Sequence, residues 1–145
     1  MRIVLQRVRS AAVRVAGETV GAIGRGVLAL VGVERGDGPR TVQAAAEKLA
    51  GLRLFEDADG KMNLDTAAAG GAFLVVSQFT LAGSVAKGRR PSFDKAAPPD
   101  EARPLVEALV EDLRRRGFEV ATGRFRAHME VSLVNDGPVT LVADF

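Results

Sequence analysis

The segment Asn135-Asp136-Gly137-Pro138-Val139-Thr140 divides the last apolar run of the chain into two halves. Residues 131–133 and 139–142 are mostly β-branched residues and leucine, which predicts two β-strands. Asp136-Gly137 favours a tight hairpin turn, because glycine adopts positive φ without steric cost. Pro138 removes a backbone donor and fixes φ, and roughly 5–6% of peptide bonds before proline are cis. We therefore expect a tight turn, with a cis Gly137-Pro138 bond that presents carbonyl groups in a fixed direction as the minority alternative.

The length and composition of the chain fit one compact domain spanning residues 1–145. A chain of 145 residues, 47% of them hydrophobic, is long enough to bury a core. No apolar stretch is long enough to span a membrane, so no membrane partner is expected. Residues 1–7 alternate like a strand and return to charge at once, unlike a signal peptide. These features predict a cytoplasmic protein.

The scarcity of reactive side chains limits the chemistry available to the chain. It has no cysteine, which excludes disulfides, thiolate nucleophiles and cysteine-based metal sites. Its single histidine, His128, stands at the start of a strand-like run, which favours an ordinary surface or edge position. We expect neither a metal nor a cofactor. What remains is binding without chemistry, or catalysis by backbone and substrate groups.

Arginine dominates the basic residues. Of the 20 Lys and Arg residues all but four are arginine, whose planar guanidinium suits phosphate. A net charge of +2 does not support general affinity for nucleic acid. The cluster Lys87-Gly88-Arg89-Arg90 could still contact a few phosphates. Arg114-Arg115-Arg116 ends a predicted helix, where cations offset the helix dipole without any ligand.

Hydrophobic periodicity predicts an α+β domain, in which two principal helices pack on a mainly antiparallel sheet that is partly closed into a barrel. A long strand is expected over residues 2–15, with a bulge near Ser10-Ala11. Continuous apolar runs at 27–33 and 73–76 predict buried strands. Further strands are expected at 19–23, 118–121, 129–134 and 139–142, and helices from residue 39 or 40 to about 54 and from 98 to about 116.

Two loops have compositions that invite a functional interpretation. Residues 56–61 are acidic, but they are too few for a calcium-binding EF-hand loop and lack its distal Glu, so we interpret them as a solvated hairpin tip. Residues 83–98 are rich in Gly, Pro, Arg and Lys, and loops of this length are often functional.

The segment Ser77-Gln78-Phe79-Thr80-Leu81 follows a predicted buried strand and precedes the basic loop. A rigid strand positions polar groups at its end well for chemistry. Gln78 could orient a carbonyl through its side chain or its N–H, as an oxyanion donor does. Thr80 could be a nucleophile, although no neighbouring base is evident, and Phe79 could stack on a ligand or pack in the core. Taken alone the segment is weak evidence, because Ser and Thr occur at strand ends in most domains.

Together the two segments resemble the paired signature motifs of the D-aminoacyl-tRNA deacylase family. The resemblance spans essentially the whole chain, in the order and spacing of the family. Its further elements are Gln6-Arg7-Val8, Gly60-Lys61-Met62-Asn63-Leu64, Arg90-Pro91-Ser92-Phe93 and Thr122-Gly123-Arg124-Phe125. It implies an enzyme of translation quality control that hydrolyses the ester bond of D-aminoacyl-tRNA, and of glycine mischarged on tRNA.

The resemblance also implies a homodimer with its active site at the interface. The Gly137-Pro138 pair of one subunit would reach into the pocket of the other, beside residues 77–80. Its peptide bond would be cis, with carbonyl groups facing the aminoacyl group. An L side chain would meet those carbonyls, whereas a D side chain would point toward the opening. A filter made of backbone would tolerate many D side chains, and glycine would pass.

A mechanism with few reactive side chains follows from the same resemblance. The scissile ester is already activated relative to an amide, so less chemical power is needed. The ribose 2′-hydroxyl would assist, and backbone around Gln78 and Phe79 would stabilise developing charge. Thr80 would then be a pocket residue beside Ser77, not a covalent nucleophile. The substrate contacts expected by this transfer are Phe125 and Met129 on the adenine, and Lys87, Arg89 and Arg90 on the tRNA.

An alternative is a nucleic-acid-binding module without activity, which rests on the arginine clusters and the basic loop. A hydrolase that acts on another ester is a third interpretation. A binding module gives no reason for a Gly-Pro turn and a Ser-Gln-Phe-Thr segment to occur together. Deacylation of D-Tyr-tRNA compared with L-Tyr-tRNA separates these interpretations.

Overall fold

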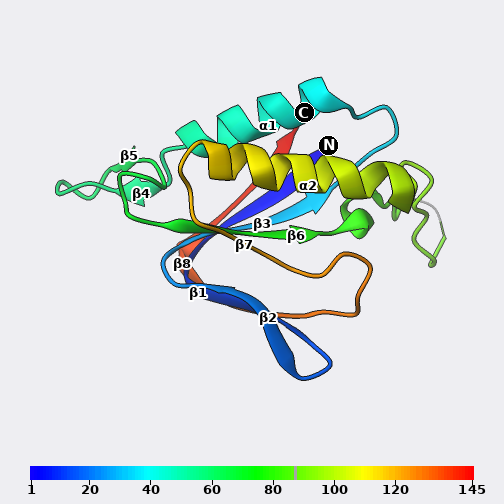
Figure 1. The fold of residues 1–145 in the computed structure, drawn as a ribbon, viewed down its shortest axis with the longest axis horizontal. Coiled ribbons are helices and arrows are strands. Elements are labelled where there is room, and N and C mark those ends of the chain that lie inside the picture. Colours follow the sequence, from blue (N-terminus) through cyan, green and yellow to red (C-terminus); the bar gives the residue numbers. More distant parts are fainter. Residues whose placement is uncertain (87) are drawn as a thin grey trace.

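A mixed β-sheet forms the centre of the computed structural model, which describes residues 1–86 and 88–145. Two helices lie together on one of its faces (Figure 1). The strands of the main sheet are β1 (Arg2–Val15), β2 (Glu18–Ile23), β3 (Gly26–Gly32), β6 (Ala72–Ser77), β7 (Val120–Thr122) and β8 (Glu130–Asp144). The expected α+β architecture is confirmed.

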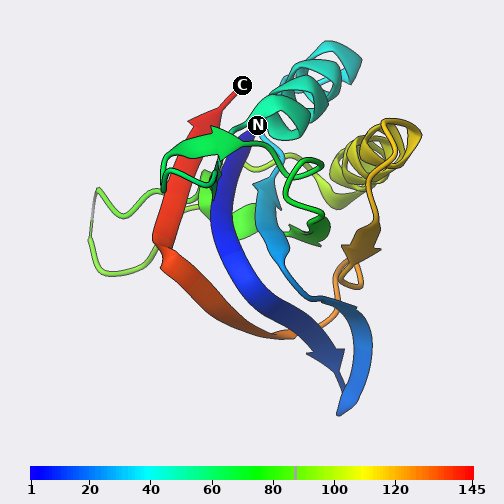
Figure 2. The ribbon, with the colours of Figure 1, turned by 90° about the vertical axis from the view of Figure 1, so that its left-hand side faces the viewer.

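The long strand β1 connects the parts of the sheet. One of its edges pairs with β8 over nearly the whole length, and the other pairs with β3 in the first half and with β2 in the second (Figure 2). These pairings are antiparallel, whereas β3 with β6 and β6 with β7 are parallel. The sheet curls until β2 meets β7, so it is nearly closed into a barrel with one seam. At that seam a Cβ on Gly21 would lie 2.2 Å from the carbonyl oxygen of Thr122, which only glycine avoids.

Alternate residues of the central strands fill two separate cores, as the period of a β-strand requires. In β3 and β6, Val27 and Phe73 face the helices, while Leu28 and Leu74 face the interior of the curled sheet. Both faces of these strands are therefore buried. This explains why their sequences are continuously apolar instead of alternating.

Both helices begin at a proline. The N–H that proline lacks would have no acceptor in the first turn of a helix, so nothing is lost there. They are α1 (Pro39–Gly51) and α2 (Pro99–Arg115). α1 buries Val42, Ala45, Ala46 and Leu49. It ends about three residues earlier than expected, because Leu52 has the extended backbone angles φ −67° and ψ 124°. Among the described residues, no helix has the length and apolar character needed to cross a membrane.

The acidic loop at residues 56–61 is a hairpin tip, as the sequence predicts. It joins β4 (Phe55–Glu56) to β5 (Met62–Leu64). The carboxylate of Asp57 accepts the backbone N–H groups of Asp59 and Lys61, at 2.9 and 3.0 Å. Asp57 therefore shapes the turn itself, which accounts for an acidic residue there without a cation.

The expected hairpin at Asp136-Gly137 is wrong. β8 continues through this segment, and both of its halves pair with β1 instead of with each other. Val8 stands opposite Asn135 and Gln6 opposite Thr140, so residues 136–139 face Arg7 alone and form a wide bulge. Against β8, the register of β1 shifts between Gln6 and Val8 and between Val8 and Ser10, next to the bulge expected near Ser10-Ala11. Against β2 it shifts between Val13 and Arg14. The Gly137-Pro138 bond is cis, and φ of Gly137 is +129°.

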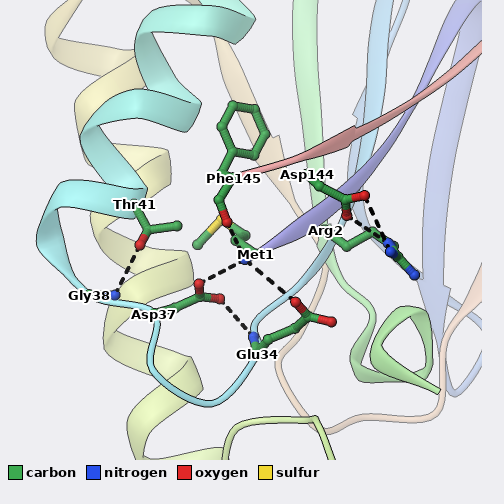
Figure 3. Close-up of polar contacts among 8 residues, drawn as sticks. All are labelled: Met1, Arg2, Glu34, Asp37, Gly38, Thr41, Asp144 and Phe145. Carbon is green, nitrogen blue, oxygen red and sulfur yellow. Dashed lines mark hydrogen bonds and ion pairs between the residues drawn. The ribbon is translucent and has the colours of Figure 1, made fainter. Parts of the chain in front are cut away.

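The far ends of β1 and β8 are fastened to each other and to the start of α1 (Figure 3). The ammonium group of Met1 donates to the Asp37 carboxylate at 2.7 Å and to the carbonyl of Phe145 at 3.1 Å. Arg2 donates to both carboxylate oxygens of Asp144, at 2.7 and 3.2 Å. These contacts fix the β1–β8 pair at the end where the two chain termini meet, whereas the bulge lies near the middle of the pair.

Candidate functional site

A cavity of ≈620 Å³, here called the main cavity, opens where β6 ends. Its walls come from the segment after β6, the end of the loop at 83–98, the start of α2 and the segment between β7 and β8. The lining residues are Val33, Val76, Ser77, Gln78, Phe79, Phe93, Ala96, Ala97, Pro99, Ala102, Phe125, Arg126, Ala127, His128, Met129 and Val131. Ser77, Gln78 and Phe79 of the predicted catalytic segment and both predicted adenine contacts, Phe125 and Met129, therefore line the same cavity.

The predicted catalytic segment turns sharply at the cavity wall. After β6, the short 3₁₀ helix η1 (Phe79–Ala82) begins, an element that the sequence did not indicate. The side-chain amide of Gln78 donates to the hydroxyl of Thr80. Ser77 and Gln78 are half-buried, and Thr80 is exposed and lies outside the cavity lining. Residues 77–79 thus face the cavity, while Thr80 holds the Gln78 side chain.

The backbone donors of this segment differ from the expectation. The N–H of Gln78 is already donated to the carbonyl of Val31 at 2.7 Å, so it cannot serve as an oxyanion donor. Within the described part of the chain, the N–H of Phe79 has no acceptor, as is usual at the start of a helix. The backbone N–H of Phe79 is therefore available to an incoming oxyanion, whereas the backbone N–H of Gln78 is not.

Two aromatic rings form the rim of the main cavity. Phe79 is 56% exposed, which is high for so large an apolar side chain. Its ring stands edge-on to that of Phe93, with centroids 5.1 Å apart. Phe93 comes from the basic loop, so this contact connects the loop to the predicted catalytic segment.

The lining of the main cavity also contains two residues that sequence reasoning missed. Arg126 has φ +63°, which is uncommon for a residue with a Cβ. His128 is exposed, as expected of a surface histidine, yet it also lines the cavity. Neither position has a local signal in the sequence, because both depend on how the segment between β7 and β8 crosses the end of β6.

The basic loop contributes less directly than its composition suggests. Arg89 and Arg90 are exposed and are not among the residues that line the main cavity. Lys87, the third predicted tRNA contact, lies outside the described residues. In the part of the chain that the structure describes, no group of three His, Cys, Asp or Glu side chains is placed to hold a metal ion.

The Gly137-Pro138 pair lies apart from the main cavity of its own chain. Both residues are exposed, and neither is among the cavity's lining residues. The bulge is held from below by Arg7, which is only 6% exposed. Its guanidinium donates to the carbonyls of Asp136 and Leu54, at 3.0 and 2.7 Å. The two signature segments are therefore not brought together within one chain.

Comparisons with known proteins agree over nearly the full length of the chain. A family model described as D-Tyr-tRNA(Tyr) deacylase matches residues 4–144. A D-aminoacyl-tRNA deacylase of Geobacter sulfurreducens is 59% identical over 144 residues, which are 99% of this chain and 95% of that protein. A D-aminoacyl-tRNA deacylase of Methylococcus capsulatus is 59% identical over 138 residues, 95% of this chain and 90% of that protein.

Two solved structures share the fold. One is named c-Myc DNA Unwinding Element Binding Protein, with a TM-score of 0.94 and 38% identity, covering 100% of this chain and 99% of that one. The other is described as "a probable eukaryotic D-amino acid tRNA deacylase", with a TM-score of 0.84 and coverage of 99% and 98%. Its identity is 19%, so it supports the fold alone.

Proposed function

The chain belongs to the D-Tyr-tRNA(Tyr) deacylase family, and we propose that it hydrolyses the ester bond of D-aminoacyl-tRNA, releasing the free D-amino acid and tRNA. The observation that carries this proposal is the main cavity, whose walls unite the predicted catalytic segment with Phe125 and Met129. The reaction belongs in the cytoplasm, where tRNA is charged.

Catalysis rests on positioning and on the substrate's own groups. The ribose 2′-hydroxyl assists attack on the ester, and the Phe79 N–H stabilises the negative charge that develops on the carbonyl oxygen. Ser77 and Gln78 shape the wall beside that oxygen. Thr80 orients the Gln78 side chain through their hydrogen bond. Because the ester is already activated, no covalent nucleophile is needed.

Discrimination by handedness is assigned to Gly137 and Pro138 of a second subunit. Their backbone would enter the main cavity and meet an L side chain, while a D side chain points outward. The exposure of both residues, outside the cavity of their own chain, supports this assignment. Glycine has no side chain that could clash with the backbone filter, so glycine mischarged on tRNA is also a substrate.

A homodimer is required for that arrangement. β8 presents apolar side chains to solvent, with Val134 53% and Val142 63% exposed. Exposed apolar side chains on one strand, next to an exposed Gly-Pro pair, fit the isologous contact of a two-fold dimer. Sedimentation of the purified protein at micromolar concentration tests this, and a monomer that retains full activity would contradict it.

The terminal adenosine is assigned to the wall formed by Phe125 and Met129, where a base can stack on the aromatic ring. Arg89 and Arg90, with Lys87, are assigned to the tRNA backbone beyond the cavity. The exposure of Arg89 and Arg90, and the Phe79–Phe93 contact that links the loop to the cavity rim, support this.

Parallel deacylation assays on D-Tyr-tRNA and L-Tyr-tRNA test the proposed reaction. We expect rapid release of D-tyrosine and no release of L-tyrosine above the uncatalysed rate. Equal rates on both would remove the chirality filter. Binding of the tRNA without release of D-tyrosine would favour a module without activity.

That module is the second candidate, and one observation favours it: a structure 38% identical to this chain is named as a DNA-unwinding-element binding protein. The small net charge of +2 argues against strong general affinity for nucleic acid. The same assay therefore decides between the two candidates.

A further inference from the structure

A second cavity of ≈350 Å³ lies next to the main one. It is bounded by one side of α2 and by the segment that follows β7. Ser77 and Phe125 line both cavities, so the two are neighbours that share a wall. The reaction proposed above uses only the main cavity.

The shared wall is an aromatic ring with a cation on it. The guanidinium carbon of Arg103 lies 5.0 Å from the centroid of the Phe125 ring, within the range of a cation–π interaction. This contact orients the ring between the cavities. A base that stacks on Phe125 in the main cavity would therefore lie next to any group bound near Arg103 in the second cavity.

The charges of the second cavity favour an anion. Arg103, Arg114 and Arg124 line it together with Glu107 and Glu111. Arg114 is occupied, because it pairs with Glu111 at 2.8 Å and donates to the carbonyl of Val120 at 3.0 Å. Within residues 1–86 and 88–145, no carboxylate lies within 4.0 Å of the guanidinium groups of Arg103 and Arg124. Two unneutralised guanidinium groups therefore face one free carboxylate.

We infer that the second cavity binds the nucleotide that precedes the terminal adenosine of the tRNA, with its linking phosphate on Arg124 and Arg103. This inference rests on the proposed function. Single-stranded RNA ends are recognised by stacking on aromatic and guanidinium planes and by contacts to phosphate, and both kinds of group occur here. The carboxylate of Glu107 adds an acceptor suited to the exocyclic amino group of a cytosine. The 3′ strand then leaves the active site along α2.

Three substrates of increasing size test the inference: the 3′-D-tyrosyl esters of adenosine and of adenosine 5′-phosphate, and D-Tyr-tRNA. The second ester adds only the phosphate assigned to Arg124. We expect wild-type kcat/KM to rise about 10-fold from the first ester to the second, as a charge-assisted contact provides. Arg124→Gln should abolish that rise through KM while leaving kcat/KM for the adenosine ester unchanged. Arg103→Gln should also abolish the rise. It should in addition lower kcat/KM for the adenosine ester, because Arg103 touches Phe125.

Arg115→Gln is the matched control, because Arg115 belongs to α2 and is exposed but does not line the second cavity. It should keep the full preference for the phosphorylated ester. Circular dichroism and thermal melting confirm that each variant is folded. Two outcomes overturn the inference while the deacylase function stands: no preference for the phosphorylated ester in the wild type, or an undiminished preference in Arg124→Gln. Failure of the wild type to hydrolyse any of the three esters overturns the proposed function itself.

Discussion

The two signature segments of this chain are built in opposite ways. Residues 77–80 follow a strand buried on both faces, and residues 77–79 form part of a cavity wall. The N–H of Gln78 is donated to Val31, and its side chain is hydrogen-bonded to Thr80. Gly137 and Pro138 instead form the tip of a bulge, fixed on its inner side by Arg7 and exposed on its outer side. One segment encloses a space within its own chain. The Gly137-Pro138 bulge is rigidly held but lines no cavity of its own chain.

This difference indicates which part of the chemistry each segment can perform. A wall positions the reacting groups of a substrate that enters it, so its side chains and donors affect the rate. A projecting backbone element has no substrate in its own chain, so it would act on a substrate held by another subunit, both positioning that substrate and discriminating its handedness. The comparison therefore predicts that changes at the bulge and changes at the wall have different effects, which the following variants measure.

Substituting Gly137 should produce the largest effect. A Cβ at this position would lie 2.9 Å from Cγ2 of Val139 and 3.0 Å from Nη2 of Arg7, at φ +129°. Gly137→Ala must therefore displace the tip of the bulge. We expect kcat/KM for D-Tyr-tRNA to fall about 100-fold, the order of loss caused by an ångström of misplacement.

Gly24→Ala is the matched control, since a Cβ there meets nothing within 4 Å. It should leave both the rate and the melting temperature unchanged. If Gly137→Ala hydrolysed D-Tyr-tRNA at the wild-type rate and still spared L-Tyr-tRNA, the bulge would have no part in the reaction.

Removing the support beneath the bulge should have the next largest effect. Arg7→Met keeps much of the side-chain volume but leaves the carbonyls of Asp136 and Leu54 without their donor. Loss of a buried charged donor costs about 2–4 kcal/mol in the free energy of unfolding. We also expect about a 10-fold loss in kcat/KM, because the bulge loses its orientation.

Urea unfolding and the deacylation assay measure these two effects separately. Arg9→Met is the control, because Arg9 pairs with the same Asp136 at 3.1 Å but is 76% exposed. It should change the free energy of unfolding by less than about 1 kcal/mol. Equal losses in the two variants would mean that Arg7 acts only as a surface charge.

Where the sequence predicted the structure well, the signal was local. The continuous apolar residues of β3 and β6 and the periodic apolar face of α1 determine their own elements. Two of the failures have distant causes. Asp136-Gly137 indicates a hairpin locally, but β1 is long enough to pair with both halves of β8 and prevents it. The N–H of Gln78 is lost to Val31, which no pattern near residue 78 could reveal.

The candidate site was predicted in part for the same reason. Phe125 and Met129 lie with residues 77–79 in one cavity, a grouping that the family resemblance implied and periodicity alone did not. Arg126 and His128 were missed because their neighbours come from β6 and the start of α2, far away in sequence.

On the wall, loss of the Thr80 hydroxyl should have a modest effect. Thr80 lies outside the cavity lining and accepts a hydrogen bond from Gln78, so Thr80→Ala only frees that side chain. We expect kcat to fall less than about 5-fold, whereas removal of a covalent nucleophile would cost a factor of about 10⁶. Thr80→Ser, which keeps the hydroxyl, should restore the wild-type kcat. Complete loss of turnover in Thr80→Ala, with tRNA binding intact, would make Thr80 a nucleophile.

The smallest effect is expected at the far end of β8, where the Arg2–Asp144 pair fastens the strand away from the bulge. The hydrogen bond from Arg2, and then its charge, lower the pKa of Asp144 below the ordinary value of 3.8. A carboxyl whose pKa is lowered by folding stabilises the folded state above its unfolded pKa, and this contribution is lost as the pH falls through the lowered value. The pair is exposed and so contributes little.

Asp144→Asn should therefore reduce the melting temperature slightly at pH 7, and the difference from wild type should disappear on acidification below pH 3.8. Its rate on D-Tyr-tRNA should equal that of the wild type, because Arg7, not the end of the strand, orients Gly137. A loss of activity in Asp144→Asn comparable to that of Arg7→Met would show that the whole β1–β8 pair positions the bulge.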